Sequence, residues 1–309
     1  MNRVTALKPG EIIPLTFDYI FTAIFNKQEN IKILENFLSC YLEIPLKEIR
    51  GKITILSRNL ELENKRVANK QVDLIVDLKG EKINIELSNK INLGIINRNI
   101  VYACSIHARQ LEYGKDSYNK INRTIQINLN NTRTNEELKE TYYLRNKKGK
   151  VLSEKFQIDM IDMELGKKLC YTNSETKLAR WCRVFTSKTE EEFKEALGDG
   201  LMEEEAREKL VEEVNQYSMD DDVIALYSAY TREELERNTI IEDANEMVEN
   251  VKRELSLELE KSKKEIEKSK KESIKQSKIE IAKKLKNNGI DIHIIEDVTG
   301  LTKKQIQTL

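Results

Sequence analysis

The sequence predicts an α/β (α+β) fold, in which a small mixed sheet is flanked by helices and followed by an all-helical C-terminal extension. Short alternating apolar runs, typical of strands, occur between residues 53 and 165, with helical periodicity between them. The three prolines, Pro9, Pro14 and Pro45, all stand early, so the second half lacks the strongest helix breaker. From Glu175 onward the pattern is helical. This order favours a layered domain with a helical tail.

The first expected elements are two amphipathic helices between Asp18 and Leu42, where apolar residues recur every three or four positions. A short strand is expected at 53–56. Two further alternating runs, at 72–78 and 82–87, flank the segment Lys79-Gly80-Glu81. A glycine between two such runs predicts a β-hairpin.

The segment after the hairpin predicts one long helix and three strands. The helical pattern covers residues 93–113, and Gly114 stands where a C-terminal cap is expected. Strands are expected at 123–129, near 142–144 and at 156–165.

The tail contains a seven-residue repeat, because Glu260-Lys-Ser-Lys-Lys-Glu265 recurs at residues 267–272. Val248, Val251 and Leu255 begin a heptad seam, but serines occupy many of its later positions and weaken a coiled coil. Two alternatives follow: a weak parallel homodimer through the C-terminal helices, or a solvated single helix.

The last thirty residues predict short helices, since Gly289 and Gly300 can end two of them, and Asp291 and Thr302 can cap those that follow. They are similar to a helix-turn-helix unit. We therefore expect a core at residues 1–187, a helical region at 188–245, a long charged helix at 246–278, and the helix-turn-helix-like unit at 279–309.

The composition limits the chemistry. Lys+Arg 52 against Asp+Glu 53 gives a formal net charge of -1, so a nucleic-acid site must be a local patch. There are two histidines, and the four cysteines lack metal-binding spacing, which predicts reduced, mostly buried thiols. Carboxylates and a hard metal ion are the expected catalysts. The first residues lack the long apolar region and the cleavage site of a signal peptide, and no apolar run is long enough for a membrane span. We therefore expect a cytoplasmic protein with no signal peptide and no membrane partner.

The predicted hairpin brings acids together. If Gly80-Glu81 is the turn, Asp73 lies opposite Ser88 and Glu86 lies diagonally from Asp73, about 7–8 Å away at Cα. The two carboxylates then share one face and can converge on one Mg²⁺. The alternative interpretation is that they solvate the outer face of the hairpin, as we expect for Asp77 near the turn.

At this point the chain resembles the Rpn-type, PD-(D/E)XK nuclease family transposases. The resemblance starts at Asp18-Tyr-Ile-Phe-Thr-Ala-Ile-Phe25 and continues through Asp73 and Ile85-Glu86-Leu87. It then includes a helix motif, the strand Thr124-Ile-Gln-Ile127, the pair Trp181 and Phe185, and a C-terminal motif between Ile281 and Thr302. The helix motif consists of Arg98, Tyr102, Gln110-Leu111, Gly114 and Tyr118.

The resemblance implies a restriction-endonuclease-like core that cleaves double-stranded DNA with Mg²⁺, or with Mn²⁺ as a substitute. Asp73 and Glu86 would hold the metal, with the Leu87 carbonyl as a further ligand. Asp18 would face the metal site or position a water. Arg98 and Tyr102 would border the substrate phosphate, although both can instead serve to pack the helix against the sheet.

The sequence departs from the family motif at Ser88, where Lys is usual and Gln frequent. A lysine there would orient the attacking water or stabilise negative charge, and serine cannot replace that charge. Lys90, of the same strand parity, or Lys70, on the opposite strand, could reach in.

Three hypotheses follow from the sequence. The first is a Mg²⁺-dependent DNA endonuclease. The second is a catalytically weakened or inactive homologue that acts as a nucleic-acid-binding or regulatory module, favoured by Ser88. In the third, the helix-turn-helix-like end reads DNA through Lys303 and Lys304, although such units also bind proteins. The lysine-rich helix before it would either add phosphate contacts or be solvated.

Overall fold

The computed structural model describes residues 7–60, 70–111, 117–133, 135–172 and 175–309, with the main chain alone at 59, 60 and 70. The chain divides into two units, one up to Tyr230 and one from Thr231 to Leu309. Each unit is considered by itself.

The first unit contains eight strands among its described residues: β1 (Ile53–Ile55), β2 (Asn59–Leu60), β3 (Lys70–Gln71), β4 (Leu74–Leu78), β5 (Glu81–Ser88), β6 (Thr124–Asn130), β7 (Lys139–Arg145) and β8 (Val151–Asp162). Its helices are α1 (Asp18–Phe25), α2 (Ile31–Leu42), α3 (Leu46–Ile49), α4 (Leu93–Ala108), α5 (Met163–Leu169), α6 (Lys177–Thr186), α7 (Glu190–Leu197), α8 (Glu204–Met219) and the start of α9 (Asp221–Asn287). The short 3-10 helices η1 (Gln28–Asn30) and η2 (Tyr118–Lys120) lie between them.

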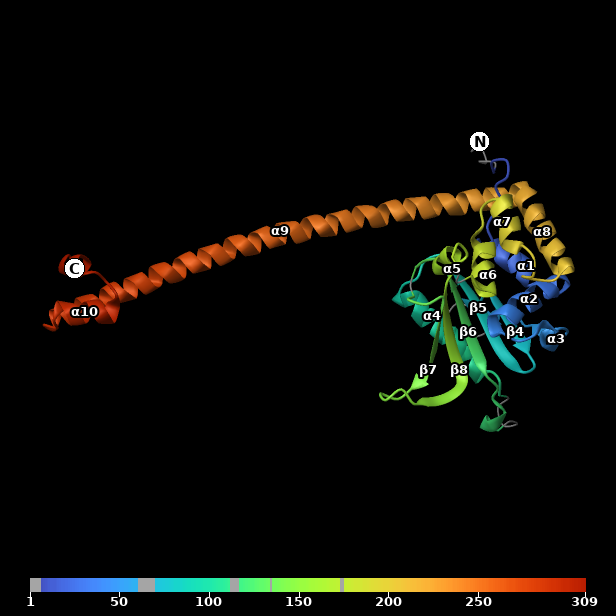
Figure 1. Cartoon of the computed structure of the whole chain (residues 1–309), viewed down its shortest axis with the longest axis horizontal. Coiled ribbons are helices and arrows are strands. Elements are labelled where there is room, and N and C mark those ends of the chain that lie inside the picture. Colours follow the sequence, from blue (N-terminus) through green and yellow to red (C-terminus); the bar gives the residue numbers. More distant parts are fainter. Residues whose placement is uncertain (1–6, 61–69, 112–116, 134, 173–174) are drawn as a thin grey trace. The chain divides into compact units, whose positions relative to one another are not determined.

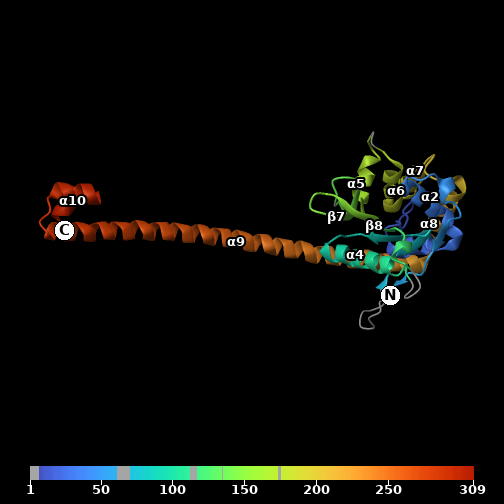
Figure 2. The ribbon, with the colours of Figure 1, turned by 90° about the horizontal axis from the view of Figure 1, so that it is seen from below.

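Six strands form a mixed sheet in the order β1-β4-β5-β6-β8-β7, and β2 pairs with β3 separately. The central strands β5, β6 and β8 run parallel, and the outer pairings are antiparallel. Helix α4 lies on one side of the sheet, and α1, α2 and α6 lie on the other (Figures 1 and 2). This architecture confirms the predicted α/β (α+β) fold with a small mixed sheet.

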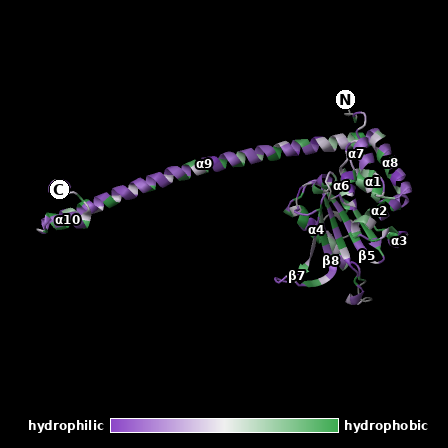
Figure 3. Cartoon of the chain, viewed as in Figure 1, coloured by the Kyte–Doolittle hydropathy of each residue, from purple (hydrophilic) through white to green (hydrophobic). Residues whose placement is uncertain are grey.

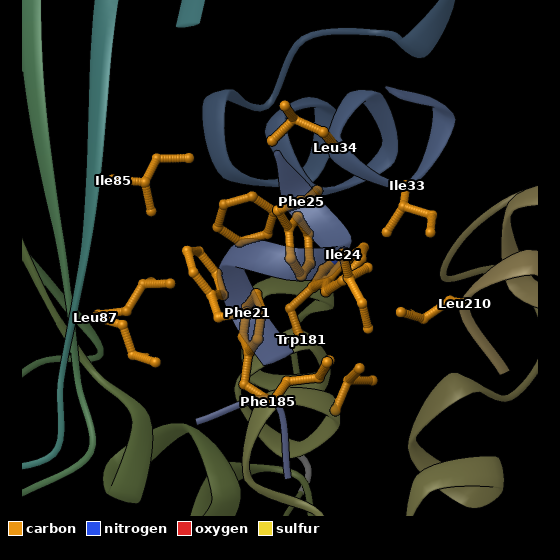
Figure 4. Close-up of a cluster of buried hydrophobic side chains, with 14 of the residues drawn as sticks. Phe21, Ile24, Phe25, Ile33, Leu34, Ile85, Leu87, Trp181, Phe185 and Leu210 are labelled. Carbon is orange, nitrogen blue, oxygen red and sulfur yellow. The ribbon is translucent and has the colours of Figure 1, made fainter. Parts of the chain in front are cut away.

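The main hydrophobic core lies between the sheet and helices α1, α2 and α6. Ile85 and Leu87 of β5 point from the sheet toward Phe21 and Phe25 of α1 (Figure 4). The rings of Phe21 and Phe25 stack with centroids 4.9 Å apart. Since burying one such side chain contributes about 1.5–3 kcal/mol, this core holds the odd-numbered face of β5 firmly inward. The even-numbered residues of β5 therefore face α4.

The hairpin of β4 and β5 differs in register from the sequence prediction. Leu78 pairs with Glu81, so the turn is Lys79-Gly80 and not Gly80-Glu81. Both turn residues have positive φ, 54° and 94°, which is the geometry of a type I′ turn. The Asp77 carboxylate accepts a hydrogen bond from the Gly80 N–H at 2.8 Å and pairs with Lys82, so Asp77 supports the turn and is not merely solvated.

Two element boundaries also differ. Helix α4 ends at Ala108, short of the predicted 113, and Gly114 lies outside the described residues. Strand β8 ends at Asp162, because the Asp162 carboxylate accepts a hydrogen bond from the Leu165 N–H at 2.7 Å and caps α5. Residues 163–165 are therefore helical and not part of a strand.

The cysteines are free, as expected, but Cys182 alone among the four is fully buried. Cys104 is exposed on α4, so the prediction of mostly buried thiols was wrong. Within the described ranges, none of the helices is both long and apolar enough to cross a membrane.

The second unit consists of the rest of α9, α10 (Ile292–Thr299) and α11 (Lys303–Gln307). The predicted caps are present: Asp291 accepts from the His293 N–H at 2.8 Å, and Thr302 forms a capping box with Gln305. Ala282, Ile295, Leu301 and Ile306 form a small core at the end of this unit. Along α9 before that core, hydrophilic residues predominate (Figure 3). The division into four segments and the homodimer remain predictions.

Candidate active site

The two predicted acids lie directly opposite each other. Extending the β4–β5 register by one residue beyond Leu74 and Ile85 places Asp73 opposite Glu86, and not opposite Ser88. The Asp73 N–H lies 3.3 Å from Glu86 Oε1, and Asp73 Oδ2 accepts from the Leu87 N–H at 2.8 Å. The predicted diagonal arrangement of Asp73 and Glu86 is therefore wrong. Their side chains still share one face of the hairpin, because a register shift of two residues keeps every side chain on the same face.

The environment of the acid pair opposes two negative charges. Glu86 is only 2% exposed, and burial together with the charge of Asp73 raises its pKa to about 8. Burial also raises the pKa of Asp73, against the opposing effects of the Leu87 N–H, Arg58 and Arg98. Two carboxylates held this close ionise together only when positive charge balances them.

Arg98 supplies part of that charge from α4. Its guanidinium lies 3.5 Å from Glu86 Oε2 and over the ring of Tyr102, 5.6 Å from the centroid. Tyr102 is buried and packs with Val72, Ile75 and Ile106. Its pKa is raised, first by burial and then by the charges of the acids. Arg98 therefore lies beside the acids, while the Tyr102 ring packs against the sheet. That both residues border the substrate phosphate remains a prediction.

Arg58 is a site residue that the sequence analysis missed. It exchanges two hydrogen bonds with Val72, the neighbour of Asp73: its Nε donates to the Val72 carbonyl at 2.7 Å, and its carbonyl accepts from the Val72 N–H at 3.2 Å. Its charge opposes the rise in the Asp73 pKa. Arg58 was missed because it lies outside the predicted strands. Its pairing with Val72, 14 residues away, has no recognisable pattern in the sequence around it.

A chain of buried amides, here called the amide network, lies under α4 beside the acids. Asn84 donates to Gln126 Oε1 at 2.7 Å, and Gln126 donates to Asn128 Oδ1 at 3.1 Å. Asn99 of α4 also donates to Asn128 Oδ1, at 2.7 Å, and accepts from Arg98 Nε at 3.1 Å. Asn84 in turn lies 3.3 Å from Glu86 Oε1. The amide network thus links Asn84 of β5 and Arg98 of α4, both of which contact Glu86.

The sequence contained a signal for this network. Polar residues occupy every even position of β5 and β6, in Lys82-Ile-Asn-Ile-Glu-Leu-Ser88 and Thr124-Ile-Gln-Ile-Asn-Leu-Asn130. This alternation predicts one polar face on each strand. It does not show that the polar face is buried, which depends on α4.

The third motif position lies inside the site. Ser88 is buried on the same face as Glu86, and its Oγ has no hydrogen-bond partner among the described residues. Lys90 follows the end of β5, so strand parity does not place its side chain as the sequence analysis assumed. Lys70 belongs to β3, which pairs with β2, and its side chain lies outside the described residues.

Asp18 begins α1 and is exposed. Two residues before it, the Thr16 carbonyl accepts a hydrogen bond at 2.8 Å from Asn89, which directly follows β5. This bond ties the start of α1 to the end of the strand that carries Glu86. The role of Asp18 at the acids remains a prediction.

The donor set suits a hard divalent cation. In the described ranges, no group of three or more His, Cys, Asp and Glu side chains is placed to hold a metal ion. Mg²⁺ requires fewer, since one or two carboxylates with water and substrate phosphate complete its shell. The paired carboxylates with raised pKa and the unpartnered Ser88 hydroxyl fit such an ion and its water.

The fold and the acid pair together define a nuclease-like site on a mixed sheet. Residues 15–244 match the model of the PD-(D/E)XK nuclease family transposases, and the chain belongs to this family. The predicted family is thereby confirmed, although the motif between Ile281 and Thr302 lies beyond the matched residues. Searches of curated proteins and of solved structures gave no match.

Proposed function

We propose that this protein is a divalent-metal-dependent endonuclease that hydrolyses phosphodiester bonds in double-stranded DNA. One observation carries the proposal: half-buried Asp73 and buried Glu86 lie side by side, where both can ionise only beside positive charge. Membership of a nuclease family supports the same reaction class. We expect the activity in the cytoplasm.

In this proposal Asp73, Glu86 and the Leu87 carbonyl hold Mg²⁺, or Mn²⁺ in its place. When bound, the ion supplies an activated water and neutralises charge on the phosphate. The Asp73 carboxylate is already oriented by the Leu87 N–H, and that of Glu86 by Asn84 and the Asp73 N–H. Such orientation before substrate arrives is what electrostatic catalysis requires.

Arg98 and Arg58 supply the positive charge that Ser88 cannot. Arg98 is 41% exposed, so its guanidinium can meet a phosphate while it remains beside Glu86. The Ser88 hydroxyl can orient a water molecule. Lys90 and Asp18 remain candidates for positioning that water, and Tyr102 borders the substrate.

The second candidate is an inactive homologue that binds nucleic acid or regulates another protein and forms a homodimer through its C-terminal helices. The observation that favours it is Ser88 at the position where the family motif usually has lysine.

A cleavage assay separates the two candidates. Supercoiled plasmid is incubated with the full chain in Mg²⁺, Mn²⁺ or EDTA, beside Asp73→Ala and Glu86→Ala. The nuclease proposal predicts metal-dependent nicking that both variants lose. Equal behaviour of wild type and variants, with or without metal, would favour the inactive homologue.

A further inference from the structure

The β7–β8 hairpin carries a cluster of positive charge, although the formal net charge of the whole chain is -1. Arg145, Lys147, Lys148 and Lys150 stand within six residues, and residues 141–153 contain no Asp or Glu. All four cationic side chains are exposed. Within the part of the chain that the structure describes, none of them is paired with a carboxylate. These four residues are called the basic tip.

The loop that presents the basic tip has a defined conformation. The Asn146 side chain accepts hydrogen bonds from the N–H groups of Lys148 at 2.9 Å and Lys150 at 3.0 Å. The Asn146 carbonyl accepts from the Gly149 N–H at 2.9 Å, and Gly149 has φ of 81°, which glycine adopts readily. The main chain of the loop is therefore held in place before a ligand arrives, which lowers the entropic cost of binding.

The hairpin also projects beyond its neighbours. The first pair between β6 and β8 is Thr124 with Phe156, so residues 151–155 extend about 16 Å past the start of β6. In Figure 1 the loop between β7 and β8 lies at the end of the sheet away from α5 and α6, and Figure 3 shows that it is hydrophilic. Leu144 and Leu152 are exposed beside the charges.

We propose that the β7–β8 hairpin is a DNA-binding arm, whose basic tip contacts the phosphates of duplex DNA. A two-stranded ribbon fits the width of the major groove, and clustered Lys and Arg release the counterions of the phosphates. The inference rests on the proposed function, because it identifies the surface that holds the substrate of that site.

The strand register gives the distance along the sheet between the basic tip and the acid pair. Glu86 is level with Asn128, and Asn128 with Met160, which lies nine residues along β8 from Val151. This is about 30 Å along the strand, or roughly nine base pairs of duplex. The basic tip would therefore contact DNA at a distance from the cleaved bond. Removal of its charges should raise KM for DNA while kcat is retained.

The test is binding of a labelled duplex of about two helical turns to the full chain in EDTA, measured by fluorescence anisotropy at several salt concentrations. In Lys147→Ala/Lys148→Ala/Lys150→Ala we expect at least about tenfold weaker binding at 0.1 M salt. The slope of the logarithm of the association constant against log salt is negative, and its magnitude should fall by about 0.9 for each lost phosphate contact. The corresponding Lys→Arg triple variant retains both.

The matched control is Lys47→Ala/Lys52→Ala/Lys188→Ala, which removes the same charge from exposed positions outside the hairpin. Unchanged affinity and slope in the hairpin variant would overturn the inference, as would an equal loss in the control. Loss of binding to phosphatidylserine vesicles without loss of DNA binding would also overturn it. EDTA prevents metal-dependent cleavage, so the binding assay does not depend on nuclease activity. A failure of the nuclease proposal would appear in the plasmid assay alone.

Discussion

The main-chain N–H of Asp73, directly before β4, lies 3.3 Å from Glu86 Oε1 of β5, so the two acids lie together at one edge of the β4–β5 hairpin. The contact follows from the Lys79-Gly80 turn, which sets the register of the hairpin. Glu86 is buried and its pKa is raised to about 8. The stability and activity of the protein should therefore both depend on pH and on divalent metal.

The first prediction concerns the pH dependence of the metal-free protein. Glu86 has its pKa raised from 4.5 to about 8 on folding, so between these values the folded state binds a proton that the unfolded state has lost. The free energy of unfolding should then fall as pH rises through this window. Asp159, whose pKa burial raises to about 7, acts in the same direction at lower pH.

Urea denaturation in EDTA at pH 7 and pH 8 isolates the contribution of Glu86. Wild type should lose stability between these values, and Glu86→Gln, which cannot ionise, should lose less. A wild-type stability that rises with pH in this interval would contradict the assignment.

The second prediction concerns Arg98, which lies 3.5 Å from Glu86. Arg98→Ala removes a charge that favours the ionised carboxylate, so the pKa of Glu86 should rise further. Cleavage should fall by about 10- to 100-fold, and its pH profile should move to higher pH. Arg98→Lys should restore the pH profile more fully than the rate, because lysine keeps the charge but loses the planar guanidinium. An unshifted pH profile in Arg98→Ala would show that Arg98 serves only packing.

The third prediction concerns Ser88, whose hydroxyl lacks a partner among the described residues. Ser88→Lys places an ammonium group on the face that carries the acids, and should lower the pKa of Glu86. The rising limb of the pH–activity profile should move to lower pH by about one unit. A folded Ser88→Lys protein with the wild-type pH profile would show that this position does not face the acids.

The fourth prediction concerns the amide network. Asn128→Leu leaves donors of Gln126 and Asn99 unpaired in the interior, so we expect a loss of about 3 kcal/mol in the free energy of unfolding. The control Asn119→Leu changes an exposed side chain and should cost less than about 0.5 kcal/mol. Comparable losses in both variants would mean that the amide network adds nothing specific.

The sequence was sufficient for the features that alternation and local motifs encode. Period-two patterns predicted the strands around Asp73 and Glu86, and capping residues such as Asp291 predicted the terminal helices. The hairpin register failed because the sequence alone did not show which two residues take positive φ, and Lys79 is not a glycine. Arg58 was missed because it reaches the acids only through pairing with Val72.

The most direct measurement is calorimetric titration of Mn²⁺ into the metal-free full chain, with Glu86→Gln and Asp77→Asn beside it. Asp77 lies in the same hairpin but pairs with Lys82, so it is a matched control outside the acid pair. If Asp73 and Glu86 hold the ion, wild type and Asp77→Asn bind Mn²⁺ and Glu86→Gln loses that binding. Equal binding of Mn²⁺ by wild type and Glu86→Gln would contradict the assignment of the metal site.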